Sequence, residues 1–179
     1  MSLDHQSPII AELHAKQAIT EVLYRYCRGM DRMDREIAET VWHPGGTADY
    51  GPATGTSTAT EFLDFVFGYH ASMQAHSHTI SNLLINVDEG GGEARSEAYV
   101  SIWLRTLPTD GKVTDLFHRG RYLDRFTRRE GDWRIDHRIF VGDLYREVEV
   151  PAPDPVPPWG RRDPDDASYR VLGNCSDAG

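Results

Sequence analysis

The hydrophobic pattern of this chain changes its period once, and this change constrains the fold more than any other feature. Up to about residue 73, apolar residues recur every three or four positions, as on one face of a helix. From residue 78 onward they alternate, as in half-buried strands. Helices followed by a run of strands predict an α+β domain, with the helices packed on one face of a curved sheet.

The first part of the chain predicts three helices and one short strand. The first helix runs from about Ile9 to Met30, and Asp31 falls at the edge of its apolar face. Further elements are expected before the strands: a short helix from Asp34 to Trp42, a strand from Thr47 to Tyr50, and a helix from Thr58 to Met73 in which Thr58 and Glu61 have capping-box spacing.

Four strand candidates follow, and turn-like segments rich in Gly and Asp separate them. They are longer than average strands, which suits a strongly bent sheet around a pocket. In the first of them, strand parity places His78 and Asn82 on one face and so indicates a partly polar cavity. The candidates are His78–Val87, Ala94–Leu107, Lys112–Thr127 and Trp133–Leu144.

The C-terminal part has a different composition. Six of the 10 prolines lie between Pro151 and Pro164, which predicts an extended strap followed by a last helical turn near Tyr169. We therefore expect one domain over residues 1–149 and a proline-rich extension over residues 150–179. The strap is expected to pack across a neighbouring subunit or the pocket mouth with Trp159 as its anchor, and a disordered tail is the alternative.

Composition excludes several kinds of partner. The chain has 19 Lys and Arg against 28 Asp and Glu, without a basic stripe, so we expect no nucleic-acid binding. It has no apolar stretch of membrane-spanning length and no signal-peptide pattern, so we expect no membrane association and a cytoplasmic location. Two isolated cysteines, Cys27 and Cys175, argue against structural zinc and a disulfide scaffold.

Three residues are the best candidates for chemistry. His78 opens a strand and Asp31 closes a helix, so they can form a base and its orienting partner. Arg138, on the last strand, can supply a fixed positive charge to the same cavity. Each also has an alternative: a structural histidine, a carboxylate without a role, and a salt bridge across the sheet. Further cavity candidates by strand parity are His118, Tyr122 and Phe126 on one strand and Phe140 beside Arg138.

Metal and cofactor sites are not expected. His76 and His78 point to the same side of a strand and form a possible metal pair, but no third ligand is evident nearby. The sequence lacks a His-Glu-x-x-His element, a phosphate loop, a dinucleotide fingerprint and a Gly-x-Ser-x-Gly elbow.

Several motifs together resemble the nuclear transport factor 2-like superfamily, in its SnoaL-like branch. They are Ala18 to Tyr26, then Asp31, then His78-x-x-x-Asn82, then Glu130-Gly131-Asp132-Trp133. The resemblance covers roughly residues 11–146. It implies a cone-shaped α+β barrel in which a curved mixed sheet, mostly antiparallel, surrounds about three helices and an internal pocket.

The resemblance also implies a reaction class. Within the superfamily the chain is similar to bile-acid 7α-dehydratase, scytalone dehydratase and γ-hexachlorocyclohexane dehydrochlorinase, whose His–Asp dyad falls on His78 and Asp31. An arginine of two of them falls on Arg138, and the pocket tyrosine of the bile-acid enzyme falls on Tyr26, which favours a dehydratase. The implied protein is a cofactor-independent lyase for a bulky apolar hydroxy-carbonyl substrate, steroid- or polyketide-like, with substrate contacts from Asn82, His118, Tyr122 and Phe140.

Other activities and an assembly state also follow from the resemblance. An isomerase or cyclase could use the same base, and a non-catalytic ligand-binding or assembly subunit could share the fold. A homotrimer is expected, with a dimer as the alternative, because the dehydratases it resembles are trimers and outward apolar rows need a partner. The expected rows are Thr79, Ser81, Leu83 and Ile85, and Ala98, Val100, Ile102 and Leu104.

Overall fold

The computed structural model describes residues 8–52, 55–153 and 160–172. The helices are α1 (Pro8–Arg32), α2 (Arg35–Thr40), α3 (Ala59–Ala71) and α4 (Ala167–Leu172). The strands are β1 (Trp42–Asp49), β2 (Thr56–Thr58), β3 (Met73–Val87), β4 (Glu93–Thr106), β5 (Lys112–Arg129) and β6 (Asp132–Pro151).

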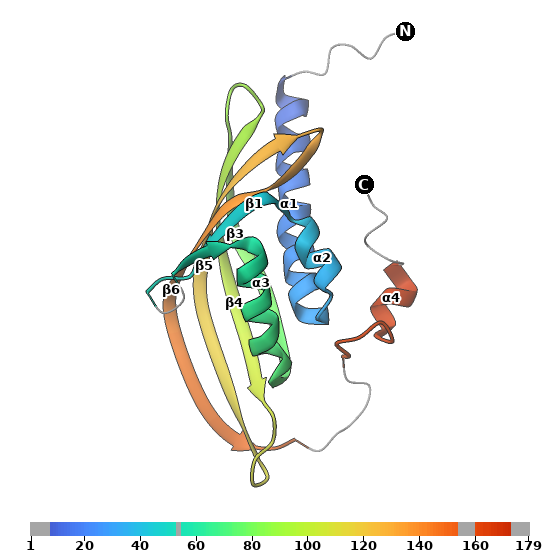
Figure 1. Ribbon diagram of the computed structural model, residues 1–179, viewed down its shortest axis with the longest axis vertical. Helices are drawn as coiled ribbons and strands as arrows, with labels where there is room; N and C mark the ends of the chain where they lie inside the picture. Colours follow the sequence, from blue (N-terminus) through green and yellow to red (C-terminus); the bar gives the residue numbers. More distant parts are fainter. Residues whose placement is uncertain (1–7, 53–54, 154–159, 173–179) are drawn as a thin grey trace.

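The strands form one curved sheet in the order β2-β1-β6-β5-β4-β3. Neighbouring strands are antiparallel except for the parallel pair β1 and β6. Helices α1, α2 and α3 lie on the same side of the sheet, and the strands bow around them (Figure 1). The predicted α+β class with a mixed, mostly antiparallel sheet is confirmed, and the sheet stays open between its edge strands β2 and β3.

Helix α1 supplies much of the core. Its buried residues Ile19, Val22, Leu23, Tyr26 and Met30 recur at helical spacing, as the sequence predicts. The predicted capping box at the start of α3 is also present, because the Thr58 side chain and the Glu61 carboxylate each accept a hydrogen bond from the other residue's backbone. Burial of one apolar stripe, together with this cap, therefore accounts for the two long helices.

Strand boundaries differ from the expected ones. β3 begins at Met73 and β6 extends to Pro151, beyond the predicted strands, and β2 was not expected. Backbone pairing explains the difference, since Met73 pairs with Thr106 and Lys112 pairs with Pro151. Ladder hydrogen bonds continue past the point where apolar side chains stop alternating.

The prediction that Asn82 shares a face with His78 is wrong. The pairing between β3 and β4 shifts between Ser81 and Leu84, and Asn82 has a φ of 45°. An extra residue at such a bulge reverses the side-chain parity of the strand. Consequently Ile80 and Leu83 both pack against the core, and Asn82 is exposed.

One of the two expected outward rows faces inward. Ala98, Val100 and Leu104 are buried, and Ile102 packs against the core. They oppose the inward residues of β3; Ile102 for example pairs with His78. In the other row the bulge turns Leu83 and Ile85 inward and leaves only Thr79 and Ser81 exposed.

The chain returns to the helices after β6. The predicted last helical turn corresponds to α4, which lies beside α1 and α2 and away from the sheet (Figure 1). The predicted anchor Trp159 and most of the proline strap lie outside the described residues. Among the described helices, none combines the length and apolarity needed to cross a membrane.

A glycine pair at a bulge offers a test of the packing between β5 and β6. Gly120 pairs with Gly142, and a Cβ atom on Gly120 would overlap the carbonyl oxygen of Val141. Gly120→Ala should therefore lower the free energy of unfolding by about 1–3 kcal/mol, because backbone must move. A Cβ on Gly142 meets its nearest atom, in the Phe140 ring, at 3.8 Å, so Gly142→Ala is the matched control. Urea denaturation measures both, and equal losses would contradict the packing described.

Candidate functional site

The structure brings Asp31 and His78 together. Asp31 lies in the last turn of α1, and its Oδ1 accepts a hydrogen bond from His78 Nδ1 at 2.7 Å. The backbone N–H of His78 donates to both carboxylate oxygens at 3.0 Å. Because the carboxylate accepts from Nδ1, the proton of the neutral ring lies there and Nε2 keeps a lone pair. The His78 side chain is only 3% exposed, so this lone pair is directed into the protein rather than to bulk water.

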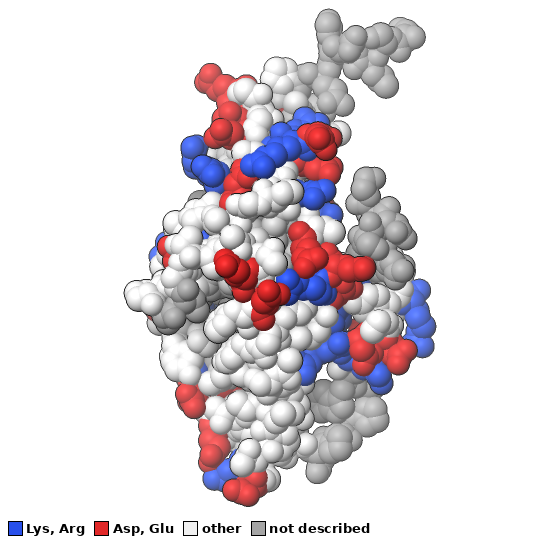
Figure 2. All heavy atoms as spheres, viewed as in Figure 1, with Lys and Arg blue, Asp and Glu red and all other residues white. Residues whose placement is uncertain are grey.

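His78 lies in the wall of an apolar cavity of about 170 Å³ between the helices and the sheet. Two lining residues of α3, Phe65 and Tyr69, are 58% and 41% exposed and mark its mouth. Glu61 and Asp64 lie in the first half of α3, and the surface below these acidic groups, over the rest of the helix, shows no charged side chains (Figure 2). The lining residues are Tyr26, Tyr50, Phe62, Phe65, Val66, Tyr69, His70, His78, Ile102, Leu104, His118, Tyr122 and Phe140.

Four of the sequence candidates besides His78 therefore reach the cavity: Tyr26, His118, Tyr122 and Phe140. Asn82 and Arg138 do not line it. Burial lowers the pKa of His118, so this imidazole is neutral at physiological pH and offers one donor and one acceptor.

Two tyrosine hydroxyls meet at the cavity. The Tyr26 and Tyr50 oxygens are 3.1 Å apart, and the Tyr50 ring stacks between Phe62 and Phe140 at centroid distances of 4.3 and 5.3 Å. Burial raises the pKa of both hydroxyls, so both remain protonated. One hydroxyl can donate to the other, which leaves the second O–H for a ligand. Tyr50 was missed as a site residue by the sequence analysis, although it is the last residue of a predicted strand.

Arg138 occupies a different position from the one expected. Its guanidinium is fully buried and donates two hydrogen bonds of 2.7 Å to the carboxylate of Asp124 on the neighbouring strand. It also lies over the rings of Tyr26 and Tyr122, at 4.2 and 3.9 Å from their centroids. The salt bridge across the sheet, left open as an alternative, is thus present. Asp124 was missed, although it shares strand parity with His118 and Tyr122.

Two further histidines lie beside the dyad. The ring of His70, at the end of α3, is 4.3 Å from that of His76 and 5.6 Å from that of His78, centroid to centroid. Burial lowers the pKa of His70 to about 2 and that of His76 to about 4, and neighbouring imidazoles add to the effect. Both rings are therefore neutral at pH 7. His70 was also missed, although it follows Phe62 and Val66 at helical spacing.

These histidines do not fit a metal site. His76 Nε2 donates to the carbonyl oxygen of Met30 at 2.6 Å, and its Nδ1 lies 3.4 Å from a guanidinium nitrogen of Arg162. Both ring nitrogens of His76 are thus engaged, and a cation already lies beside one of them. Across the described part of the chain, no group of three or more His, Cys, Asp or Glu side chains is arranged to hold a metal ion.

The neutral histidines predict a pH-dependent stability. Below pH ~6.5 the unfolded chain protonates His70 and His76 while the folded protein does not, so the free energy of unfolding falls as the pH drops. Near pH 5 each such histidine contributes a slope of about 1.4 kcal/mol per pH unit. His70→Gln should remove one such contribution, and His14→Gln, at an exposed position of α1, should not. Urea denaturation between pH 7.5 and 5 measures the slopes, and an unchanged slope in His70→Gln would contradict a neutral buried ring.

Comparison with known proteins agrees with this architecture. The family model of the SnoaL-like domain matches residues 11–139. A scytalone dehydratase-like protein from Novosphingobium aromaticivorans superimposes with a TM-score of 0.68 at 20% identity, covering 82% of this chain and 95% of that one. LinA superimposes with a TM-score of 0.70 at 13% identity, covering 85% of this chain and 100% of that one.

A protein of unknown function, Rv3472 from Mycobacterium tuberculosis, superimposes with a TM-score of 0.64 at 21% identity, covering 76% of each chain. At these identities, the three structures establish a shared fold only. No curated protein matches the sequence. The match of the family model over most of the chain shows that this protein belongs to the SnoaL-like family, within the nuclear transport factor 2-like superfamily.

Proposed function

We propose that this protein is a cofactor-independent lyase, a dehydratase that removes water from a bulky, mostly apolar hydroxy-carbonyl compound of steroid or polyketide type. One observation carries the proposal: the His78 imidazole, held by Asp31 at 2.7 Å, lies in the wall of an apolar cavity. Two of the similar structures support an elimination reaction by their names. One is the scytalone dehydratase-like protein, and the other is a second type of LinA, which is named a hexachlorocyclohexane dehydrochlorinase.

In the proposed reaction, His78 Nε2 removes a proton from the carbon next to the substrate carbonyl. Asp31 holds the ring in the required tautomer and stabilises the imidazolium that forms. As the carbon–oxygen bond to the leaving hydroxyl breaks, the imidazolium returns its proton to that oxygen. The products are water and an unsaturated carbonyl compound, and His78 is again neutral.

The tyrosine pair suits the substrate carbonyl. Negative charge builds on the carbonyl oxygen as the proton leaves, and a protonated hydroxyl of Tyr26 or Tyr50 can donate a hydrogen bond to it. Arg138 lies behind the Tyr26 and Tyr122 rings, and its positive charge lowers the pKa of both hydroxyls against the larger effect of burial. In this proposal Arg138 therefore stabilises the oxyanion through the tyrosines and makes no contact with the leaving group.

The size of the cavity bears on the substrate. Its volume of about 170 Å³ is below the ~300–1,000 Å³ typical of ligand pockets. The reacting end of a bulky substrate would fill the enclosed part beside His78. The remainder would leave between Phe65 and Tyr69 and lie on the uncharged surface over the second half of α3 (Figure 2).

Product analysis tests the proposal against its rivals. The purified protein is incubated with a panel of hydroxy-keto steroids and polyketides, and the products are analysed by mass spectrometry. A dehydratase gives a product lighter by one water, whereas an isomerase or cyclase with the same base gives a product of unchanged mass. Binding without turnover across the panel would favour a non-catalytic ligand-binding or assembly subunit.

Substitution of the dyad gives a quantitative prediction. His78→Ala should lower turnover at least about a hundredfold, as expected for the loss of a general base. Asp31→Asn should lower it nearly as much, because an amide can present the wrong partner to the imidazole. The double variant should be no worse than His78→Ala, since the pair acts as a unit. His14→Ala on the exposed side of α1 is the control, circular dichroism checks folding, and wild-type turnover in either single variant would exclude the dyad.

We also propose that the protein assembles as a homotrimer, with a dimer as the alternative. Trp103 on β4 and Leu144 on β6 are 53% and 64% exposed. They line a groove of about 550 Å³ together with Phe117, Val148 and Val150. Exposed apolar patches of this kind mark protein interfaces.

Light scattering at micromolar concentration should give about three times the chain mass of 20.2 kDa. Trp103→Glu should shift the protein toward the monomer, because a carboxylate would be buried in the interface without a partner. Tyr24→Glu is the matched control, since Tyr24 is an equally exposed aromatic residue, 54%, on α1. A monomeric wild-type protein would refute the assembly.

A further inference from the structure

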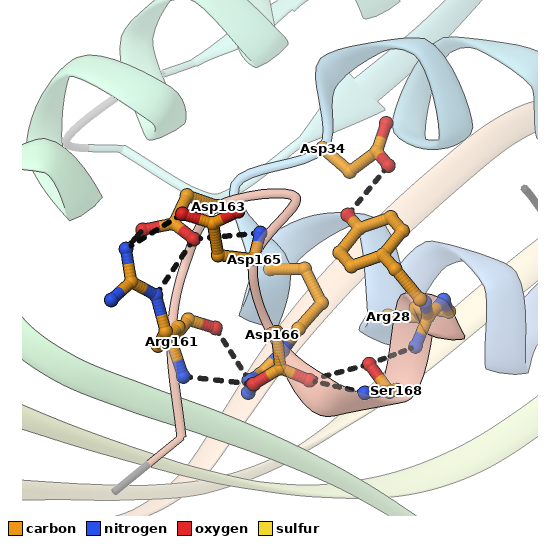
Figure 3. A network of polar contacts seen from close by, with 9 residues as sticks. Arg28, Asp34, Arg161, Asp163, Asp165, Asp166 and Ser168 are labelled. Atoms are coloured by element: carbon orange, nitrogen blue, oxygen red, sulfur yellow. Dashed lines mark hydrogen bonds and ion pairs between the residues drawn. The ribbon is translucent and has the colours of Figure 1, made fainter. Parts of the chain in front are cut away.

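The segment Gly160–Leu172 docks on the end of α1 that carries Asp31 (Figure 3). Arg28 donates to the Ser168 hydroxyl at 3.1 Å, and its guanidinium lies 4.8 Å from the centroid of the Tyr169 ring. The Tyr169 hydroxyl donates to Asp34 Oδ2 at 2.7 Å, and Asp34 Oδ1 accepts from the backbone at the start of α2. The docked segment therefore contacts the chain on both sides of Asp31, at Arg28 in α1 and at Asp34, the N-cap of α2.

Asp166 holds the segment in a fixed shape. Its carboxylate accepts hydrogen bonds from the backbone N–H groups of Arg161 and Ser168, at 2.8 and 3.0 Å (Figure 3). It also accepts from Arg32 on α1 at 3.0 Å, and the same guanidinium nitrogen donates to the Arg161 carbonyl at 2.7 Å. These bonds fix the backbone next to Arg162, and so determine where its side chain points.

Arg162 joins this segment to the beginning of β3. Its Nη1 donates to the carbonyl oxygen of His70 at 2.7 Å, and its Nη2 donates to that of Met73 at 2.6 Å. His70 lies in the last turn of α3, where carbonyl groups lack helical partners and a cation is favourable. One guanidinium therefore fixes the turn that leads from α3 into β3.

The third contact of Arg162 is with His76, which lies next to the Asp31–His78 pair. His76 Nε2 must carry the ring proton, because it bonds to the carbonyl oxygen of Met30, which only accepts. The lone pair of Nδ1 therefore faces Arg162 Nη1 at 3.4 Å. Met30 directly precedes Asp31, and His76 stands two residues before His78 on the same face of β3. The chain of contacts from Arg162 through His76 to Met30 thus connects the same two elements as the dyad.

We propose that Arg162 is a positioning residue for the Asp31–His78 pair. Through Arg162, the docked C-terminal segment contributes to the geometry of the site. The inference rests on the proposed function, because it assigns Arg162 a part in the same reaction. Asp31 bonds to both the ring and the backbone N–H of His78, so these three bonds depend on how β3 lies against the end of α1. Arg162 itself does not line the cavity, so it would act on that relation without contact to the substrate. If Arg162 only added stability, its removal would leave the geometry of the Asp31–His78 pair unchanged.

The test compares the same substitution at two adjacent positions. Arg162→Met removes the three contacts and keeps much of the apolar volume. Arg161→Met is the matched control, because the Arg161 side chain is 54% exposed and its ion pairs are to Asp163 and Asp165 within the segment. Arg162→Lys is a milder second variant, since one ammonium group cannot span both carbonyls and the imidazole.

The first readout is nuclear magnetic resonance of the full-length protein without substrate. The ring Nδ1–H and the backbone N–H of His78 both donate to a carboxylate and report on the dyad directly. We expect both resonances to move in Arg162→Met, to move less in Arg162→Lys, and to stay in place in Arg161→Met. If Arg162→Met does not fold, Arg162→Lys decides. Wild-type resonances in the folded Arg162 variants would overturn the proposal.

The second readout is kinetic and uses a substrate found in the product screen. For Arg162→Met we expect kcat to fall on the order of tenfold, with KM within about twofold, since a misplaced base affects the chemical step. Arg161→Met should keep both constants within about twofold of wild type. An unchanged kcat in Arg162→Met would overturn the proposal. The resonance experiment needs no turnover, so failure of the proposed dehydration is distinguishable from failure of the positioning role.

Discussion

The buried ion pair between Arg138 and Asp124 is the interaction on which the interior of the protein depends. Both side chains are fully buried, and a charge in such a place is tolerated only when it is paired and hydrogen-bonded. The pair joins the two central strands, and the Tyr26 ring places α1 directly over the guanidinium. The position of α1, and with it that of Asp31, therefore depends on a charge that the solvent never reaches.

The sequence predicts those parts of the fold and site that depend on local pattern. Helix α1, the cap of α3 and the juxtaposition of Asp31 with His78 follow from periodicity, residue type and resemblance. The reversal of side-chain parity at Asn82 cannot be predicted in this way. A bulge depends on how two strands pair, and the alternating residue types along β3 show no sign of it. His70 and Asp124 were missed for a related reason. His70 lies beside His76 and His78, and Asp124 pairs with Arg138, and the sequence around each residue gives no sign of these partners.

The site combines two kinds of support. On the cavity side, aromatic residues from α3, β5 and β6 form an apolar wall beside His78. On the other side, Arg162 of the C-terminal segment donates to the backbone at the start of β3, and His76 of β3 donates to the backbone of α1 next to Asp31. Apolar packing is non-directional, and its part is to exclude water from the cavity. Hydrogen bonds are directional, and their part is to orient β3 against the end of α1. In the proposed reaction, the base would benefit from both.

The bulge at Asn82 divides β3 into two parts with different inward residues. Before it, His76, His78 and Ile80 face inward, and His78 faces the cavity. After it, Leu83, Ile85 and Val87 pack against the core at the other end of the sheet. A single strand thus carries the candidate site in one half and core contacts in the other, and the bulge puts the side chains of the two halves out of phase. Substitutions in the first half can therefore change the candidate site while the second half keeps its contacts with the core, so the two halves of this strand are modular.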